Sequence, residues 1–216
     1  MLLGGAETVP TVIEWTMSEA LRKPPVMKKL QDELECVVGL GRMVTESDLP
    51  RLVHLQAVVK ETLRLHPTGP FLSRYLYSES CSVLGYEIPR KTCVLVNLWA
   101  IARNPKSWED AENFKPERFM EGVGSGVDAN GDRNFGWIPF GEGRRKCPGE
   151  QLGTLVVEFG LAQLLHCFNW KLPSDDMNGE NEELNMTERF NGITLPRAHE
   201  LSAIPTARLE CIAHLK

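Results

Sequence analysis

The residues between positions 140 and 149 are the ones whose types and spacing could carry out chemistry. The segment reads FGEGRRKCPG, with one cysteine, Cys147, among glycines and basic residues. A cysteine thiolate is a nucleophile and a metal ligand, and glycine adopts backbone conformations that other residues avoid. Pro148 favours the first turn of a helix, which predicts Cys147 at a helix N-terminus, where the dipole favours its thiolate. A lone Cys-Pro-Gly would also fit a turn beside an inert core cysteine.

The complete pattern, F-x-x-G-x-R-x-C-x-G, resembles the haem-binding signature of the cytochrome P450 family, the haem-thiolate monooxygenases. The resemblance implies haem b as the cofactor, with Cys147 as the axial thiolate ligand of its iron. It also implies that Arg145 pairs with a haem propionate and that Phe140 packs beside the thiolate and keeps water away. Gly143 then lets the loop turn, and Gly149 lets the flat ligand approach closely.

A second motif, GGAET at residues 4–8, is similar to the oxygen-activation segment of the same family. By resemblance, Thr8 supplies a hydroxyl and Glu7 a carboxylate that relay protons toward bound dioxygen. A helix start built from small residues explains the motif as well. Pro10 departs from the family pattern and removes a helical hydrogen bond to the carbonyl of Ala6. Two outcomes are open: a wider oxygen groove, or a disrupted helix.

A third motif, Glu61-Thr-Leu-Arg64, places an acid and a base on one helix face. Alone, such a pair is typical of a solvated surface and contributes little. The surrounding residues are apolar, which indicates partial burial and a need for further hydrogen bonds. In the family this pair interlocks with an arginine of the following irregular segment, and Arg118 matches that position. The resemblance therefore gives Glu61, Arg64 and Arg118 a structural role around the cysteine loop.

Arg74 lies in the sequence Phe71-Leu-Ser73-Arg74. It matches a family position that reaches a haem propionate from a small sheet. The family commonly has proline where this chain has Ser73. An arginine on an edge strand that faces water is an equally good interpretation.

Hydrophobic periodicity divides the chain into helices, then short strands, then an irregular stretch and a last helix. We predict helices over residues 9–21, 24–38, 48–65 and 151–167, strands over 72–76, 83–88, 92–97, 193–195 and 207–212, an irregular segment over 104–137 and a polar loop over 174–183. This order is not βαβ alternation. It predicts a mainly α fold with a small β-sheet, and by resemblance the C-terminal portion of the cytochrome P450 fold, with residues 1–216 as a single partial domain.

Composition limits the other classes of function. The chain of 216 residues is 42% hydrophobic, enough for a sizeable core, and its net charge of −5 argues against nucleic acid as a partner. We find no signal peptide and no apolar run long enough to cross a membrane. The six cysteines form no C-x-x-C pair, so zinc ribbons and ferredoxin-type clusters have no support. Their wide spacing favours a reducing compartment.

The resemblance implies the reaction and its partners. One atom of O2 enters a C–H bond of a small hydrophobic substrate, with electrons from NADPH through a separate reductase. Arg144 and Lys146 would meet this reductase, their charges acting mainly on association rate. The segments Trp137-Ile-Pro-Phe-Gly and Leu195-Pro-Arg are similar to plant-type members, which often act in secondary or lipid metabolism. Such members are expected on the cytosolic face of the endoplasmic reticulum membrane.

The resemblance covers nearly all of this chain, whereas the chain covers less than half of a family member. We therefore expect the membrane anchor and most of the substrate pocket to lie outside it. Two hypotheses follow: a haem-dependent monooxygenase whose ligand loop and core lie here, or a truncated, non-catalytic product that folds partially or binds haem without turnover. A redox or metal module without haem is a third class, which only the cysteine count supports.

Overall fold

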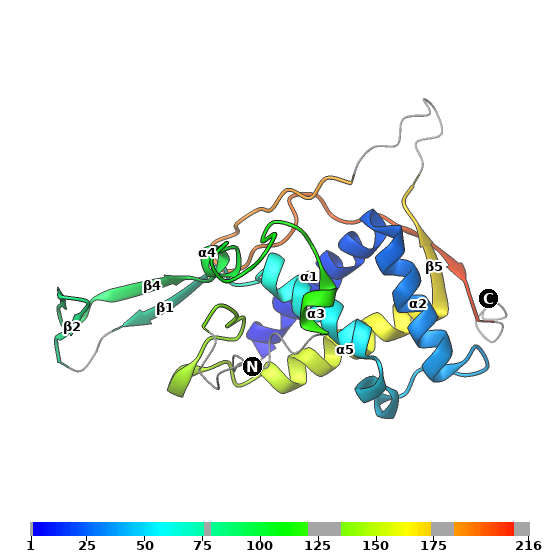
Figure 1. The fold of residues 1–216 in the computed structure, drawn as a ribbon, viewed down its shortest axis with the longest axis horizontal. Coiled ribbons are helices and arrows are strands. Elements are labelled where there is room, and N and C mark those ends of the chain that lie inside the picture. The colour runs from blue at the N-terminus through cyan, green and yellow to red at the C-terminus, as the bar shows by residue number, and fades with distance from the viewer. Residues whose placement is uncertain (1, 76–78, 121–134, 174–183, 210–216) are drawn as a thin grey trace.

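The structure, a computed structural model, describes residues 2–75, 79–120, 135–173 and 184–209. Its α-helices are α1 (Leu2–Arg22), α2 (Pro24–Val38), α3 (Val53–Leu65), α4 (Leu98–Ala102) and α5 (Glu150–Cys167). Short 3-10 helices are η1 (Glu46–Arg51), η2 (Pro116–Phe119) and η3 (Gly143–Arg145). The four long helices gather into one body, and a narrow β arm projects from it (Figure 1). The predicted mainly α fold is confirmed.

Local sequence sets several helix ends. Pro24 occupies the first turn of α2, where its missing N–H is not needed, and Gly39 ends that helix with φ of 79°. The prediction of one helix over residues 48–65 is wrong, because Leu52, with φ of −88° and ψ of 68°, separates η1 from α3. The N-terminus of α3 is instead capped by Glu33 of α2, whose carboxylate accepts the backbone N–H groups of His54 and Leu55.

In the described parts of the chain, the strands form three small, two-stranded antiparallel sheets. The pairs are β1 (Phe71–Tyr75) with β4 (Cys93–Asn97), β2 (Cys81–Val83) with β3 (Tyr86–Ile88), and β5 (Phe168–Lys171) with β6 (Ile204–Ala207). The prediction of a single strand over residues 83–88 is wrong, because Leu84 and Gly85 have positive φ and reverse the chain.

Of two further strands predicted near the C-terminus, one is absent and the other overlaps an observed strand at a single residue. Residues 193–195 form no strand but a turn, which the Asn191 side chain closes by accepting the backbone N–H groups of Ile193 and Thr194. The strand predicted over residues 207–212 overlaps β6 only at Ala207, and residues 210–212 lie outside the described part of the chain, as does the predicted loop over 174–183.

The core lies where α1, α2, α3 and α5 meet. Leu30, Leu34, Leu55, Leu161 and Leu165 are fully buried there, and burying such a side chain stabilises the fold by roughly 1.5–3 kcal/mol. Residues 184–201, which we call the C-terminal strap, run across α1 (Figure 1). The hydrogen bonds that bind the strap there include one from Trp15 Nε1 to the carbonyl of Leu195 at 3.0 Å and one from the N–H of Leu201 to Glu14 at 2.9 Å.

None of the helices in the described ranges has the length and apolar character that crossing a membrane requires. Cys36, Cys81, Cys93 and Cys147 are exposed and have free thiols, whereas Cys167 is buried. Cys211 lies outside the described residues.

Candidate functional site

The cysteine loop, residues 140–149, is closed at its neck by one backbone hydrogen bond. The N–H of Cys147 donates to the carbonyl of Phe140 at 2.9 Å. Gly141 and Gly143 make the intervening turn possible, since their φ angles of 72° and 78° are strained for any residue with a side chain. The loop therefore holds the sulfur of Cys147 at a fixed and exposed position.

The structure corrects the predicted relation between the cysteine and the helix that follows. Helix α5 begins at Glu150 with Gly149 as its N-cap, and the carbonyl of Gly149 accepts the N–H of Gly153 at 2.7 Å. Pro148 therefore precedes the helix instead of occupying its first turn. Because a proline disfavours the helical conformation at the residue before it, Cys147 lies two residues ahead of the cap.

Arg74, on β1, joins the sheet formed by β1 and β4 to the cysteine loop. Its Nη2 donates to the carbonyl of Arg145 at 3.0 Å, and its Nη1 donates to the carbonyl of Ser73 at 2.8 Å. A Cβ atom on Gly141 would lie 3.5 Å from the Arg74 guanidinium, an ordinary van der Waals contact, so glycine is required at this position by its positive φ rather than by Arg74. Arg145 has no side-chain partner among the described residues, which leaves its guanidinium available to an anionic group.

A cavity of about 540 Å³ lies between α1, the cysteine loop and α5. Its lining residues are Gly4, Gly5, Thr8, Val9, Pro10, Phe140, Cys147, Pro148, Gly149, Leu152, Gly153 and Val156. The volume is within the range of small-molecule and cofactor sites, and the lining is mostly apolar. The side chains of Leu152 and Val156 are 62% and 43% exposed on this wall.

These residues fit a flat apolar cofactor with an iron centre. The Cys147 sulfur supplies a soft ligand on the cavity wall, and the exposed apolar wall of α5 supplies a surface that such a ring would cover. A Cβ atom on Gly149 would lie 3.8 Å from the sulfur, so a side chain there would occupy space directly beside the ligand atom.

The opposite wall is α1, which continues through Pro10 without ending. Of the two outcomes left open by the sequence, disruption of the helix is therefore excluded. Two threonine hydroxyls next to the proline bond back onto the preceding turn: Thr8 donates to the carbonyl of Gly4 at 2.6 Å, and Thr11 donates to the carbonyl of Glu7 at 2.7 Å.

Thr8 and Glu7 have different surroundings. Thr8 lines the cavity, whereas Glu7 is not among the lining residues. The Glu7 carboxylate accepts a hydrogen bond from the hydroxyl of Thr194 in the C-terminal strap, at 3.4 Å. The structure thus places the predicted hydroxyl at the cavity and the predicted acid against the strap.

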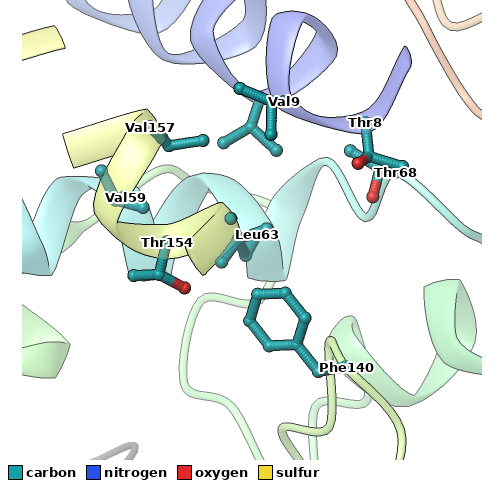
Figure 2. A pocket seen from close by; sticks show the side chains of 10 residues that line it. Thr8, Val9, Val59, Leu63, Thr68, Phe140, Thr154 and Val157 are labelled. Atoms are coloured by element: carbon teal, nitrogen blue, oxygen red, sulfur yellow. The ribbon is translucent and has the colours of Figure 1, made fainter. Parts of the chain in front are cut away.

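Phe140 lines both the large cavity and a second one of about 40 Å³ between α1, α3 and α5. Figure 2 shows its ring reaching from the cysteine loop toward Leu63. Thr68 and Thr154 also line the small cavity, and sequence reasoning did not single them out. Neither belongs to a motif, and only the packing of three helices brings them together.

Glu61, Arg64 and Arg118 lie together in a buried network. Glu61 and Arg64 are fully buried, with Arg64 Nε 2.8 Å from Glu61 Oε2 and Nη2 2.9 Å from Glu61 Oε1. Arg118 Nε lies 3.2 Å from the same carboxylate. The surface interpretation of this pair is therefore excluded. The network joins α3 to η2 and to residues 102–115.

The basic residues of the loop differ in their pairing. Glu150 accepts a hydrogen bond from Lys146 Nζ at 2.7 Å, and this bond raises the pKa of Lys146 above its ordinary value. The Lys146 charge is thus partly neutralised by its own helix. Arg144 has no ion pair among the described residues and is exposed.

The structure thus combines an exposed cysteine sulfur on the wall of a mostly apolar cavity with a buried Glu-Arg-Arg network, in a mainly helical fold. The sequence model of the family described as Cytochrome P450 matches residues 1–196, and the chain belongs to this family. Its members are haem-dependent monooxygenases, and membership implies a haem-iron cofactor with a thiolate ligand.

Individual relatives agree with this assignment. The chain is 47% identical over 211 residues to Cytochrome P450 84A1 of Arabidopsis thaliana and 48% identical over 206 residues to geraniol 8-hydroxylase of Catharanthus roseus, covering 98% and 95% of this chain. A zebrafish cytochrome P450 solved with progesterone superimposes with a TM-score of 0.81 at 32% identity, over 95% of this chain and 44% of that one. The chain spans 39% and 40% of the length of these two plant relatives.

Proposed function

We propose that the protein containing this chain is a monooxygenase that binds haem b through Cys147. The observation that carries this proposal is the exposed Cys147 sulfur at the wall of the apolar cavity between α1 and α5. When bound, a thiolate-ligated haem iron supplies the activation of O2, because the thiolate pushes electron density toward the iron and favours O–O cleavage.

The residues around the cavity have separate roles in this proposal. Phe140 shields the sulfur from water on one side, and Gly149 leaves room for the ring. Arg145 and Arg74 bind the propionates, Arg145 with its whole guanidinium and Arg74 with the donors that the loop backbone does not use. Thr8 holds a proton donor at the cavity, and Glu7 exchanges protons between Thr8 and solvent. Glu61, Arg64 and Arg118 keep the segments around the loop in place.

Further features of the reaction follow from the family. We propose a small hydrophobic substrate, because the similar plant proteins include a geraniol 8-hydroxylase and a 3,9-dihydroxypterocarpan 6A-monooxygenase. Electrons come from NADPH through a reductase that binds near Arg144, an exposed loop cation with no ion pair among the described residues. The location proposed for the whole protein is the cytosolic face of the endoplasmic reticulum membrane.

The first experiment is the carbon-monoxide difference spectrum of the reduced, haem-loaded protein. We expect a strongly red-shifted Soret band from the unmodified protein and from Cys36→Ala, whose cysteine is exposed on α2, remote in the chain from the cysteine loop. Cys147→Ala should lose this band. The same spectrum from all three proteins would exclude Cys147 as the ligand.

A second candidate function is haem binding without turnover. The observation in its favour is the apolar surface beside Cys147, where Leu152 remains 62% exposed, since an open haem face admits water and side reactions. An activity assay with a reductase distinguishes the monooxygenase from a protein that binds haem without turnover. Product formed in proportion to the NADPH consumed supports the monooxygenase, whereas NADPH consumption that yields only hydrogen peroxide supports the second function.

A further inference from the structure

The partner of Glu7 is a residue that no sequence motif includes. Thr194 Oγ1 donates to Glu7 Oε2 across a separation of 187 residues in the chain. Thr194 is only 4% exposed, although the Glu7 carboxylate reaches it from an exposed turn of α1. A buried hydroxyl thus faces the acid that the proposed function uses as a proton carrier.

Asn191 fixes the direction of this hydrogen bond. Its Oδ1 accepts the backbone N–H groups of Ile193 at 3.2 Å and Thr194 at 2.8 Å. The oxygen must face these two donors, so the amide nitrogen Nδ2 faces Thr194 Oγ1, 2.8 Å away, and donates to it. The hydroxyl proton of Thr194 is then directed away from Asn191, toward the carboxylate of Glu7. An ionised carboxylate can only accept such a bond.

The turn that carries Thr194 is held by a hydrogen bond within it and by two hydrogen bonds of the next residue, Leu195. Within it, the N–H of Asn191 donates to the carbonyl of Thr194 at 3.2 Å. Next to it, Leu195 donates its N–H to the carbonyl of Thr68 at 2.9 Å and accepts the indole N–H of Trp15 at 3.0 Å. The hydroxyl therefore cannot follow the carboxylate if Glu7 turns away.

The separation of 3.4 Å is longer than the 2.7–2.8 Å usual for an O–H···O bond. The bond is accordingly weak, and the exposed carboxylate can leave it. We propose that Thr194 is a positioning residue, whose hydroxyl, oriented by Asn191, sets the resting position of the Glu7 carboxylate. This inference rests on the proposed function, in which Glu7 carries protons to Thr8.

The test is isotope-edited infrared spectroscopy of the complete, haem-loaded protein with ¹³C-labelled glutamate. The carboxylate stretching bands of Glu7 are identified by subtracting the spectrum of Glu7→Gln. We expect these bands to shift in Thr194→Val, which removes the hydroxyl, and to remain in place in Thr194→Ser, which keeps it.

A second variant tests the direction of the bond. Asn191→Asp keeps an oxygen acceptor for the two backbone N–H groups but replaces the donor that faces Thr194 with another acceptor. The Thr194 proton should then turn toward position 191, so the Glu7 bands should shift as they do in Thr194→Val although Thr194 is intact. In turnover, Thr194→Val and Asn191→Asp should each raise severalfold the share of electrons that ends in hydrogen peroxide. In Thr194→Ser this share should equal that of the unmodified protein.

Glu7 bands that stay in place in Thr194→Val and Asn191→Asp would overturn the inference. Bands that shift in Thr194→Ser as they do in Thr194→Val would overturn it as well, because such a shift would reflect disturbance of the turn rather than loss of the hydroxyl. The failure of the proposed function has a different signature. It is the absence of the red-shifted Soret band from the unmodified protein, whereas the infrared bands report only the contact between Glu7 and Thr194.

Discussion

At the scale of single residues, Arg64 uses all five of its N–H groups inside the core. Besides the two bonds to Glu61, its Nη1 donates to the carbonyls of Ala102 and Ala111 at 2.7 and 2.8 Å, and its Nη2 donates to that of Asn113 at 3.3 Å. The Glu61 carboxylate also accepts the N–H of Lys115 at 2.7 Å. A fully buried ion pair of this kind is tolerated because these further bonds satisfy it.

We therefore expect Arg64→Lys to lower the free energy of unfolding by about 3 kcal/mol. Lysine keeps the charge, but its ammonium cannot form the planar fork, so buried carbonyls and part of the carboxylate lose their donors. Urea denaturation with an unchanged slope measures this loss. The control is Lys28→Gln in the Lys28–Asp32 pair, 74% and 60% exposed, where about 0.5 kcal/mol or less is expected. Equal losses in both variants would contradict the prediction.

The sequence predicts part of this network. The spacing of Glu61 and Arg64 places both on one helix face, and the apolar neighbours indicate burial. The carbonyls that complete the network come from residues 38 to 49 positions further along the chain. Ala102 ends α4, whereas Ala111 and Asn113 lie in the segment without periodicity, so nothing local predicts that these carbonyls converge on one guanidinium.

At the scale of elements, the 3-10 helix η1 depends on one carboxylate. Asp48 accepts the backbone N–H of Thr45 at 2.9 Å and Arg42 Nη1 at 2.7 Å, and its side chain is only 3% exposed. The hydrogen bond from Arg42, together with those from Thr45 and Arg51, holds the pKa of Asp48 well below its usual range. The segment between α2 and α3 is thereby kept compact.

The pKa of Asp48 gives a prediction of pH dependence. A carboxyl whose pKa is lower in the folded state stabilises the fold above its unfolded pKa of about 3.9, and this contribution is lost as the pH falls through the folded pKa. Asp48→Asn should lower the free energy of unfolding by about 1–2 kcal/mol at pH 7. The difference from the unmodified protein should shrink below about pH 4.

Thermal unfolding between pH 3 and pH 7 measures this difference. Asp32→Asn, on the exposed surface of α2, is the matched control and should change little at either pH. A difference between the unmodified protein and Asp48→Asn that stays constant with pH would show that the variant acts through shape rather than through charge.

Element boundaries were predictable where the chain carries a strong local signal. Pro24 and Gly39 mark both ends of α2, and the structure agrees. The break at Leu52 has no such signal, since apolar residues continue through it. The turn at Leu84 and Gly85 was hidden in the same way, because a β-type composition continues on both sides of one glycine.

At the scale of the whole molecule, the C-terminal strap, α1 and the end of α3 meet around His66. Its ring stacks on Trp15, with centroids 4.0 Å apart and planes 3° from parallel, and its Nε2 lies 2.9 Å from Glu19 Oε1. Burial alone would raise the pKa of Glu19, but hydrogen bonds with His66 and Arg22 hold it below its usual range. Glu188 of the strap lies 3.5 Å from the other ring nitrogen.

We expect Trp15→Phe to loosen the strap without displacing α1. Phenylalanine keeps an aromatic ring against His66 but leaves the buried carbonyl of Leu195 without its donor, which costs about 1–3 kcal/mol. Amide hydrogen exchange of residues 191–195 should accelerate about tenfold or more, while exchange in α2 stays unchanged. Uniform acceleration over both regions would indicate global destabilisation instead.

The position of the strap was the least predictable part of the fold. Its residues were interpreted as a weak strand, since Ile193, Thr194 and Leu195 have β-type side chains. The long-range hydrogen bonds of Thr194 and Leu195 run instead to residues 7, 15 and 68. Partners about 130 to 190 positions away leave no trace in local composition, so the contact between Glu7 and Thr194 could only come from the structure.

The strap also has a consequence for how this protein is made. Trp15 and Glu14 find their partners 180 and 187 residues later, an interval that a ribosome takes roughly 10–40 s to translate at about 5–20 residues per second. During that time the face of α1 that binds the strap is without its partner. A nascent chain stalled before residue 195 should therefore present this face to molecular chaperones, and release of the last segment should end that exposure.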